Sequence, residues 1–529
     1  MEEDFGMTAK KRNMIVWIVF ALALFAGLCI FFFKIDPVTV FDTDDWSILT
    51  NFRKHRFLPG KDEWNPSRVM PEIMMPFAGF VGRVLFIRAR GFYDAAVMGM
   101  GLVLAAFITA YVALTARMIG KKFGIGIAGE ILIELFVLFV HFIAFITGKG
   151  KFGFFFYEMN ACSVFYYTIP TIFNCIIICL TIIYEEYIRH FFRKEHIVCK
   201  IVYLIMIYFA VFSNLYASVV IAAFSAAKIL QYFFIEVRDR TTDRIDKLIQ
   251  CSVYIYTLIL WFVSMAFELA GGRATQFSEV KFDVKAAFLD YKNTFYGKNI
   301  LFDIMIAAAL VFYIVMLVRI LRNKDRFVKP IIERVKTTSK KKRDELMIDP
   351  MDELLFSYVN QTSLYLVCFV LTSAFLILLR AKTGAGYFGH LAVQLNYFMF
   401  LLMNVYGMIA YLIRMQKKVL YGVAVLVAAM AWIAMFSGVT YSEYNMRGLS
   451  NENCKALADY ITEQYVEADE NNVEYAYIHV PNFHTEDNFP IANYGNARFA
   501  NTLYQYGVTS RFINSELVLD DSLNERFGL

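Results

Sequence analysis

Three carboxylates close to the start of the chain are the first candidates for chemistry. Asp42, Asp44 and Asp45 follow an apolar run, residues 14–34, after only a short spacer. Because adjacent like charges repel, the pKa of one member of the Asp44–Asp45 pair should be raised. A carboxylate with a raised pKa is suited to act as a general base. The structural alternative is a solvated acidic turn that pairs with nearby basic residues, namely Arg53, Lys54 or Arg56.

Further polar and aromatic residues are predicted to lie at the same membrane depth as these carboxylates. Arginine stays charged and presents a fork that matches a phosphate group, so arginines here could bind a phosphate at headgroup level or act as interface anchors. The two tryptophans could stack on a sugar or belong to the interfacial aromatic belt. The candidate substrate-binding residues are Asp42, Trp46, Trp64, Arg68, Glu72, Arg273, Arg380, Lys382, Tyr387 and His390. Arg68 and Glu72 are one helical turn apart in this set.

The composition determines what kind of molecule must position these residues. Of 529 residues, 58% are hydrophobic and 19% are charged, whereas a soluble domain is about 45–50% apolar and about 25% charged. The scarcity of charge excludes a soluble multidomain enzyme, and the abundance of phenylalanine and isoleucine excludes disordered and fibrous classes. A membrane protein with several spans remains.

Eleven apolar segments are long enough, or nearly so, to cross a bilayer, which takes about 20 residues. They are residues 14–34, 94–116, 125–147, 167–184, 201–214, 216–233, 249–269, 299–320, 354–379, 391–413 and 418–438. Residues 73–87 are also apolar, but Arg83 interrupts them. We expect this stretch to lie on the membrane surface, with a full span as the competing interpretation.

The distribution of basic residues orients these segments. Lysine and arginine are concentrated in every second connection, most densely in residues 319–343, and the positive-inside rule places these connections and the N-terminus in the cytoplasm. The basic loop is therefore interpreted as topogenic, and no nucleic-acid partner is expected. The opposite side receives a first outer loop, residues 35–93, together with residues 270–298 and the tail.

The tail, residues 439–529, differs in composition from the membrane domain, residues 1–438. It is rich in Asp and Glu. Ser450 or Asn451 can cap a helix over residues 450–469. A strand-like run follows at residues 475–480, and Pro481 ends it. The predicted fold is thus an all-α polytopic membrane protein of about eleven helices, with a small extracytoplasmic α/β appendage that packs on the membrane domain.

This combination resembles the GT-C superfamily of membrane glycosyltransferases, whose members have many spans, an acidic motif in the first outer loop and an extracytoplasmic tail. The resemblance rests on Asp42-Thr43-Asp44-Asp45-Trp46, Trp64-Asn65-Pro66-Ser67-Arg68, the glycine-rich run from Gly384 to Gly389 between Arg380 and His390, and tail segments from Val480 to Val508. The resemblance in architecture covers most of the chain, whereas the resemblance in sequence motifs is limited to short segments.

The resemblance implies an activity and roles for particular residues. The donor would be a sugar on a polyprenyl phosphate, and the acceptor an envelope glycan or glycolipid at the outer face of the cell membrane. Asp44 first, and Asp45 second, would be the base in an inverting transfer. Arg68, Arg273 and Arg380, with Lys382 behind them, would stabilise the leaving phosphate.

Two departures limit what the resemblance implies. No Trp-Trp-Asp motif occurs in the tail, so transfer of a whole oligosaccharide to protein asparagine is disfavoured. The spacing of Asp42 and Asp44 could suit Mg²⁺ or Mn²⁺, but family members with lipid-monophosphate donors generally need no metal, and we expect no cofactor. The eight cysteines form no CxxC pair, so no zinc site is expected either.

A stripe of ionisable residues supports a competing function. Glu130, Glu134 and His141 share one face of the predicted span 125–147. Such a stripe can mark a proton or ion path, which would make the protein a multi-pass transporter or a flippase of lipid-linked sugars. The stripe could instead be buried and pair with other spans through Asn174, Asn214 or Asn360, and Glu130 could simply lie at the cytoplasmic end of the span. A third hypothesis is a non-catalytic scaffold whose acidic tail binds a partner.

Overall fold

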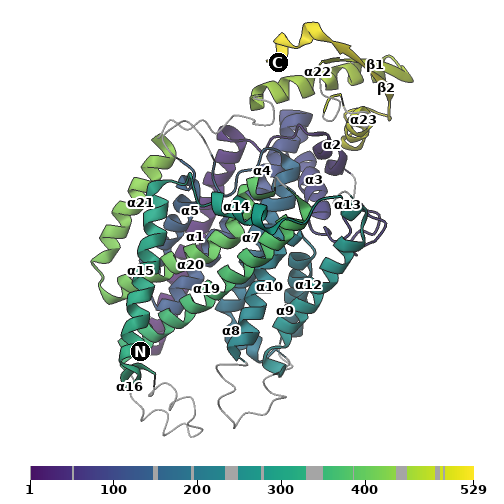
Figure 1. Cartoon of the computed structure of the whole chain (residues 1–529). Coiled ribbons are helices and arrows are strands. Elements are labelled where there is room, and N and C mark those ends of the chain that lie inside the picture. Colours follow the sequence, from purple (N-terminus) through teal and green to yellow (C-terminus); the bar gives the residue numbers. More distant parts are fainter. Residues whose placement is uncertain are drawn as a thin grey trace.

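The computed structural model shows a mostly helical chain with one small sheet near the C-terminus (Figure 1). It describes residues 2–50, 53–146, 153–191, 196–232, 248–275, 279–328, 349–384, 387–436, 449–482, 489–491 and 495–528. The side chains of residues 2–10 and of Arg273 are outside this description, as is most of the basic loop 319–343. The coarse prediction of a helical membrane protein with a small α/β appendage is confirmed.

Within the described residues, eight helices are long and apolar enough to cross a membrane. They are Lys11–Ile35 (the end of α1, Glu2–Ile30, with the π-helical turn η1, Phe31–Ile35), α4 (Phe92–Phe123), Ala161–Ile183 (ending in α7, Ile169–Ile183), Leu248–Ala270 (containing α12, Ser252–Ala270), α15 (Ile300–Arg322), α19 (Pro350–Thr383), α20 (Leu391–Met415) and α21 (Val419–Phe436). Shorter apolar helices are α5 (Ile127–Ile143), α9 (Ile197–Val211) and α10 (Leu215–Leu230). All eleven predicted segments therefore fall on helices, and eight of these helices reach spanning length.

The apolar stretch at residues 73–87 is part of a helix, α3 (Pro71–Arg90), that folds back against α4. Gly91 allows the reversal because its φ of 83° is accessible mainly to glycine. Gly82 and Gly99 let the two backbones touch, since a Cβ added at Gly82 would lie 2.1 Å from the Ala95 carbonyl oxygen. The apolar side chains on the outer face of α3, among them Phe80, remain exposed.

The tail forms a compact α/β unit at one end of the bundle (Figure 1). Its elements are α22 (Asn451–Glu470), β1 (Tyr475–Pro481), α23 (Gly495–Tyr506) and β2 (Asn514–Asp520). The predicted helix and strand are confirmed, and Ser450 is the N-cap, accepting a 3.1 Å hydrogen bond from the Asn453 amide. The strand β2 was not predicted; it pairs in parallel with β1, with Leu517 opposite Ile478.

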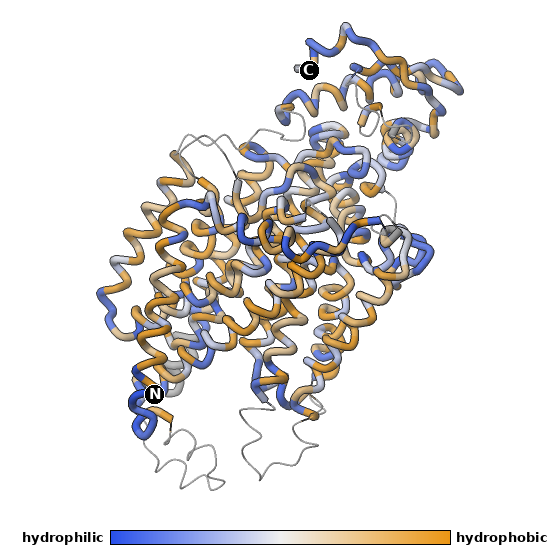
Figure 2. Tube along the Cα trace, viewed as in Figure 1, coloured by the Kyte–Doolittle hydropathy of each residue, from blue (hydrophilic) through white to orange (hydrophobic). Residues whose placement is uncertain are grey.

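The tail packs on the first loop through Trp46. This residue lies in a short helix, α2 (Thr43–Thr50), and is fully buried. Its ring is 4.7 Å from that of Phe499 on α23, and its carbonyl accepts a 3.0 Å hydrogen bond from the Thr502 hydroxyl. Figure 2 shows the contrast between the apolar bundle and the more hydrophilic tail. The predicted domain boundary at residues 438 and 439 lies outside the described residues.

Candidate active-site cavity

A cavity of about 790 Å³ lies where the first loop, the segment around residues 159–167 and the tail helix α23 meet. Six of the twelve candidate residues line it: Asp42, Asp44, Trp64, Arg68, Glu72 and His390. Residues that were not among the candidates also line it, including Asn160, Tyr166, Tyr167 and Arg498. The cavity is thus polar, aromatic and of mixed charge.

The structure separates the two adjacent carboxylates Asp44 and Asp45. Asp44 begins α2, is exposed and lines the cavity. Its backbone amide donates a 3.1 Å hydrogen bond to the carboxylate of Asp42. Asp42 in turn accepts a 3.0 Å hydrogen bond from the Asn160 side chain. Asp44 is therefore the carboxylate that a substrate in the cavity could reach.

Asp45 lies on the other face of α2 and is fully buried. Its carboxylate accepts hydrogen bonds from the backbone amides of Phe41 at 2.9 Å, Asp42 at 3.0 Å and Cys162 at 2.5 Å. Burial, reinforced by the nearby charge of Asp42, raises the pKa of Asp45. The raised pKa expected for one of the pair thus belongs to a residue that does not line the cavity. Through these hydrogen bonds Asp45 connects the first loop to residue 162. This structural role replaces its expected role as second base.

Arg68 is the buried cation of the site. It is 5% exposed and lines both the main cavity and a smaller one of about 90 Å³. Its guanidinium lies over the Tyr166 ring, 5.2 Å from the centroid. Within the described part of the chain it donates no side-chain hydrogen bond to protein and forms no ion pair. A buried arginine in this state has donors available for an anionic ligand.

Glu72 lines the cavity, but protein groups already occupy its carboxylate. Arg53, buried beneath the loop, contacts it at 2.6 Å, and the Asn65 side chain and the Tyr166 hydroxyl donate to it at 3.0 and 2.9 Å. Arg53 also donates to the carbonyl of Pro66 at 3.0 Å. Glu72 and Arg53 form an ion pair and therefore hold the loop that carries Arg68.

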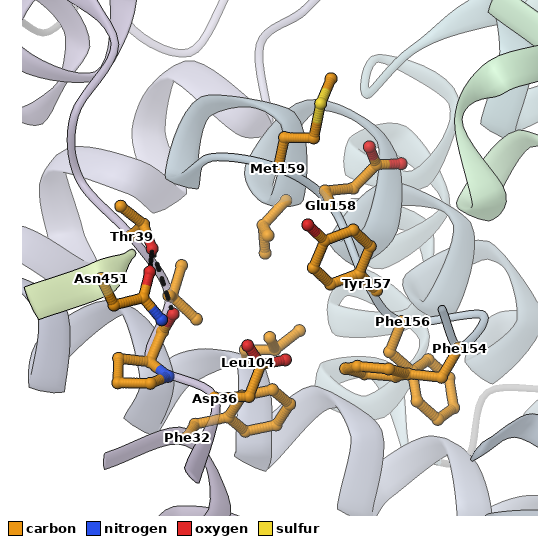
Figure 3. A pocket seen from close by; sticks show the side chains of 13 residues that line it. Phe32, Asp36, Thr39, Leu104, Phe154, Phe156, Tyr157, Glu158, Met159 and Asn451 are labelled. Atoms are coloured by element: carbon orange, nitrogen blue, oxygen red, sulfur yellow. Dashed lines mark hydrogen bonds between the residues drawn. The ribbon is translucent and has the colours of Figure 1, made fainter. Parts of the chain in front are cut away.

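His390 is positioned from two sides at the cavity wall. Its Nδ1 is 2.8 Å from the Glu158 carboxylate, and its ring stacks on Tyr167 with centroids 4.0 Å apart. Burial raises the pKa of Glu158, which His390 partly opposes. Behind Glu158 is a small cavity of about 20 Å³ that also receives Asp36 (Figure 3). In that view the side chains of Thr39 and Asn451 hydrogen-bond across the cavity wall.

The remaining candidates do not line the main cavity. Lys382 and Tyr387 line the smaller cavity that shares Arg68, and Tyr387 stacks on Tyr216 at 4.7 Å. Arg380 is buried and bonded to Asp290, with a 2.9 Å contact from its Nε. Arg273 lies in α13 (Gly272–Thr275), but its side chain is outside the described residues.

Trp46 is the other correction, because it is enclosed by aromatic rings of α4 and the tail instead of facing a sugar. Trp64 is 55% exposed and does line the cavity. The tail residues that help to enclose Trp46 come from more than 400 positions away in the sequence, and Arg498 reaches the cavity from the tail helix α23. No local pattern could have identified either fact.

The ionisable stripe on α5 is buried. Glu130 is bonded to Arg117 at 2.7 Å, and His141 contacts the carbonyl of Val137 at 2.6 Å and the hydroxyl of Tyr111 at 3.2 Å. Glu134 is fully buried, and neither of its carboxylate oxygens has a hydrogen-bond partner in the described structure. Glu130 and His141 thus have protein partners, as the structural alternative expected, but these partners are not the expected asparagines. Asn174, Asn214 and Asn360 hydrogen-bond to other groups.

No group of three or more His, Cys, Asp or Glu residues among those described is arranged to hold a metal ion. The Asp42 carboxylate accepts a hydrogen bond from Asn160, but these two side chains alone are too few to form a cage for a hard cation.

Comparison with known proteins adds no identification. No protein-family model, curated protein or solved structure matches the chain.

Proposed function

We propose that the protein is a membrane glycosyltransferase that takes a sugar from a polyprenyl-phosphate donor. The acceptor is an envelope glycan or glycolipid, and transfer takes place at the outer face of the cell membrane. The observation that carries this proposal is the joint presence of Asp44 and Arg68 on one large cavity at an end of the apolar bundle. A reaction that removes a proton at one point and releases a phosphate at another requires this pair of groups.

In the proposed reaction, Asp44 accepts the proton of the acceptor hydroxyl. The hydroxyl oxygen forms a bond to the anomeric carbon as the bond from that carbon to the phosphate oxygen breaks. The electron pair leaves with the lipid phosphate, and the sugar inverts its configuration. Arg68 binds the departing phosphate, whose lipid chain extends towards the smaller cavity lined by Lys382 and Tyr387.

Other residues of the cavity have positioning roles in this proposal. Asp45 and Asp42 fix the first turn of α2 and so place Asp44. Trp64 offers an exposed aromatic face to the sugar, and Arg498 brings a second cation from the tail. No metal ion takes part in the mechanism.

The proposal includes a topology. All eleven helices cross the membrane, the N-terminus is cytoplasmic and the tail is extracytoplasmic, which brings the cavity to the outer leaflet where a polyprenyl-phosphate sugar is available. A reporter enzyme fused after residue 529 tests this arrangement. Activity of a reporter that works only in the cytoplasm would contradict both the topology and the location of the site.

The central experiment compares Asp44→Asn with Asp45→Asn in the purified full-length protein. The assay offers a panel of hexoses on short polyprenyl phosphates and an extract of envelope glycolipids, and detects sugar transfer by mass spectrometry. Asp44→Asn should lower the rate about 10²–10⁴-fold. Asp45→Asn should retain measurable transfer in the molecules that remain folded. Full activity of Asp44→Asn would refute the assignment of the base.

The competing transport function has its own expected result. Glu134→Gln would abolish movement of a lipid-linked sugar across reconstituted vesicles, while Asp44→Asn would leave that movement intact. Under our proposal Glu134→Gln leaves sugar transfer within about twofold of the parent, because the glutamine side chain is neutral and has nearly the same shape as that of glutamate.

A further inference from the structure

A second large cavity lies on the other side of the first loop. It is a groove of about 500 Å³ between the end of α1, the junction of α3 with α4, and the first turn of the tail helix α22. It shares no lining residue with the candidate active-site cavity. Its function is therefore a separate question from sugar transfer.

One part of this groove is apolar and belongs to two candidate membrane spans. Ile30 and Phe33 come from the end of the span Lys11–Ile35, and Val97 and Met98 from the start of α4. Ile30 is 61% exposed, so its side chain is available to a neighbouring hydrocarbon chain. These residues lie at the ends of the spans, where the acyl region of a bilayer gives way to its headgroups.

The other part of the groove is charged, and three of its charges are unpaired. Lys455 contacts Asp94 at 3.4 Å and Asp459 at 2.7 Å, so its charge is already paired with carboxylates of the protein. Lys34, Arg90 and Glu452 also line the groove, and none of them forms an ion pair or side-chain hydrogen bond with another residue of the described chain. The groove therefore presents two cations and one carboxylate at headgroup depth.

We propose that this groove binds a bilayer phospholipid whose headgroup carries both a phosphate and a primary amine. The phosphate lies between Lys34 and Arg90, the ammonium group lies at Glu452, and an acyl chain runs along Ile30 and Phe33. The two cations match the phosphodiester, and the carboxylate matches the amine. Such a lipid is a constituent of the membrane, in contrast to the polyprenyl-phosphate donor of the proposed reaction.

The bound lipid connects the tail to the bundle. Lys34 belongs to η1 and Arg90 is the last residue of α3, whereas Glu452 belongs to α22 of the tail. The headgroup thus bridges two parts of the chain that otherwise meet mainly through α2 and α23. Loss of the lipid should loosen the first turn of α22.

The test uses the full-length protein, delipidated in detergent and titrated with phosphatidylethanolamine or phosphatidylglycerol of identical chains. Native mass spectrometry counts the bound lipids, and hydrogen exchange of residues 450–455 reports on α22. The double variant Lys34→Gln/Arg90→Gln should weaken binding of the tightest phosphatidylethanolamine at least tenfold and abolish the lipid-dependent protection. The matched control Lys61→Gln/Arg88→Gln removes the same charge at exposed positions outside the groove and should bind as the parent does.

The single variant Glu452→Gln distinguishes the headgroup from a general anion. It should lower the preference for phosphatidylethanolamine over phosphatidylglycerol at least threefold, while binding of phosphatidylglycerol stays unchanged. Equal lipid binding by the parent and the Lys34→Gln/Arg90→Gln variant would overturn the proposal. Stronger binding of a polyprenyl phosphate than of phosphatidylethanolamine at this groove would also overturn it.

Discussion

Charged side chains at the two ends of the helical bundle differ in whether they are paired within the protein. At the end away from the tail, Glu185 receives three cations, with contacts of 2.8 Å to Lys228, 3.5 Å to Arg189 and 3.8 Å to Lys122. At the end under the tail, Arg68 is buried beside two cavities and has no hydrogen-bonded carboxylate in the described chain.

This difference indicates which charges stabilise the fold and which are available for a ligand. A buried charge is costly unless it is paired. Glu185 is paired with cations of the protein itself. Arg68 keeps its charge whatever its surroundings, and its guanidinium donors are available to an anion that enters the cavity. Each of the following predictions tests this contrast between the Glu185 cluster and Arg68.

Removal of Glu185 should give the largest effect. Glu185→Gln leaves the buried ammonium of Lys228 without its carboxylate, and loss of one partner of a buried pair costs about 3–5 kcal/mol of the free energy of unfolding. Sugar transfer per folded molecule should not change. Thermal unfolding in detergent and a transfer assay measure the two quantities. A double variant, Glu185→Leu/Lys228→Met, should recover most of the lost stability. If stability is not recovered, Glu185 contributes more to the fold than its pairing with Lys228.

Arg68→Gln should lower activity and leave stability intact, which is the reverse of the result expected for Glu185→Gln. Sugar transfer should fall about 10²–10³-fold, as for the loss of one donor to a developing oxyanion, while the melting temperature stays equal or rises because no ion pair is lost. Arg53→Gln is the matched control: Arg53 is buried, charged and bonded to Glu72, so its loss should lower the melting temperature. A lower melting temperature for Arg68→Gln than for Arg53→Gln would contradict the contrast.

Asp45→Asn should have a smaller effect, and on stability. The amide brings N–H donors to a place where three backbone amides already donate. A buried donor left unsatisfied costs about 1–3 kcal/mol. Chemical unfolding with a tail-specific and a bundle-specific probe would measure the loss. If the Asp45→Asn protein is as stable as the parent, Asp45 does not have the structural role assigned to it.

Asp36 provides the smallest and most specific test. It lies beside the small cavity in Figure 3, and its side chain forms no hydrogen bond with another described residue. Burial raises its pKa, so the folded state binds the proton more tightly than the unfolded state, whose pKa is about 3.9. This contribution to stability is present below about pH 4 and is lost as the pH rises towards the raised value.

Asp36→Asn should remove that pH dependence. Between pH 4 and pH 8 the melting temperature of the parent should fall relative to that of the variant. Parallel profiles would mean that Asp36 has the same pKa in both states. The comparison with Arg68 is direct, because a buried carboxyl can become neutral by taking a proton, whereas a buried arginine cannot.

Local patterns in the sequence were sufficient to predict the apolar helices and part of the tail, but not the strand β2. Each of the eleven predicted apolar segments lies on a helix, and the tail contains the predicted helix after Ser450 and the strand ended by Pro481. Helix capping, hydrophobic run length and chain reversal depend on residues a few positions apart. Such features are therefore accessible without a structure.

The roles of the candidate residues were decided by tertiary structure. Asp44 and Asp45 are neighbours with the same chemistry, yet Asp44 faces the cavity while residue 162 binds Asp45. Trp46 is buried by the tail, and Arg380 is bonded to Asp290. Exposure and pairing depend on groups that arrive from distant parts of the chain, so the sequence determined which residues could do chemistry, and the packing decided which of them line the cavity.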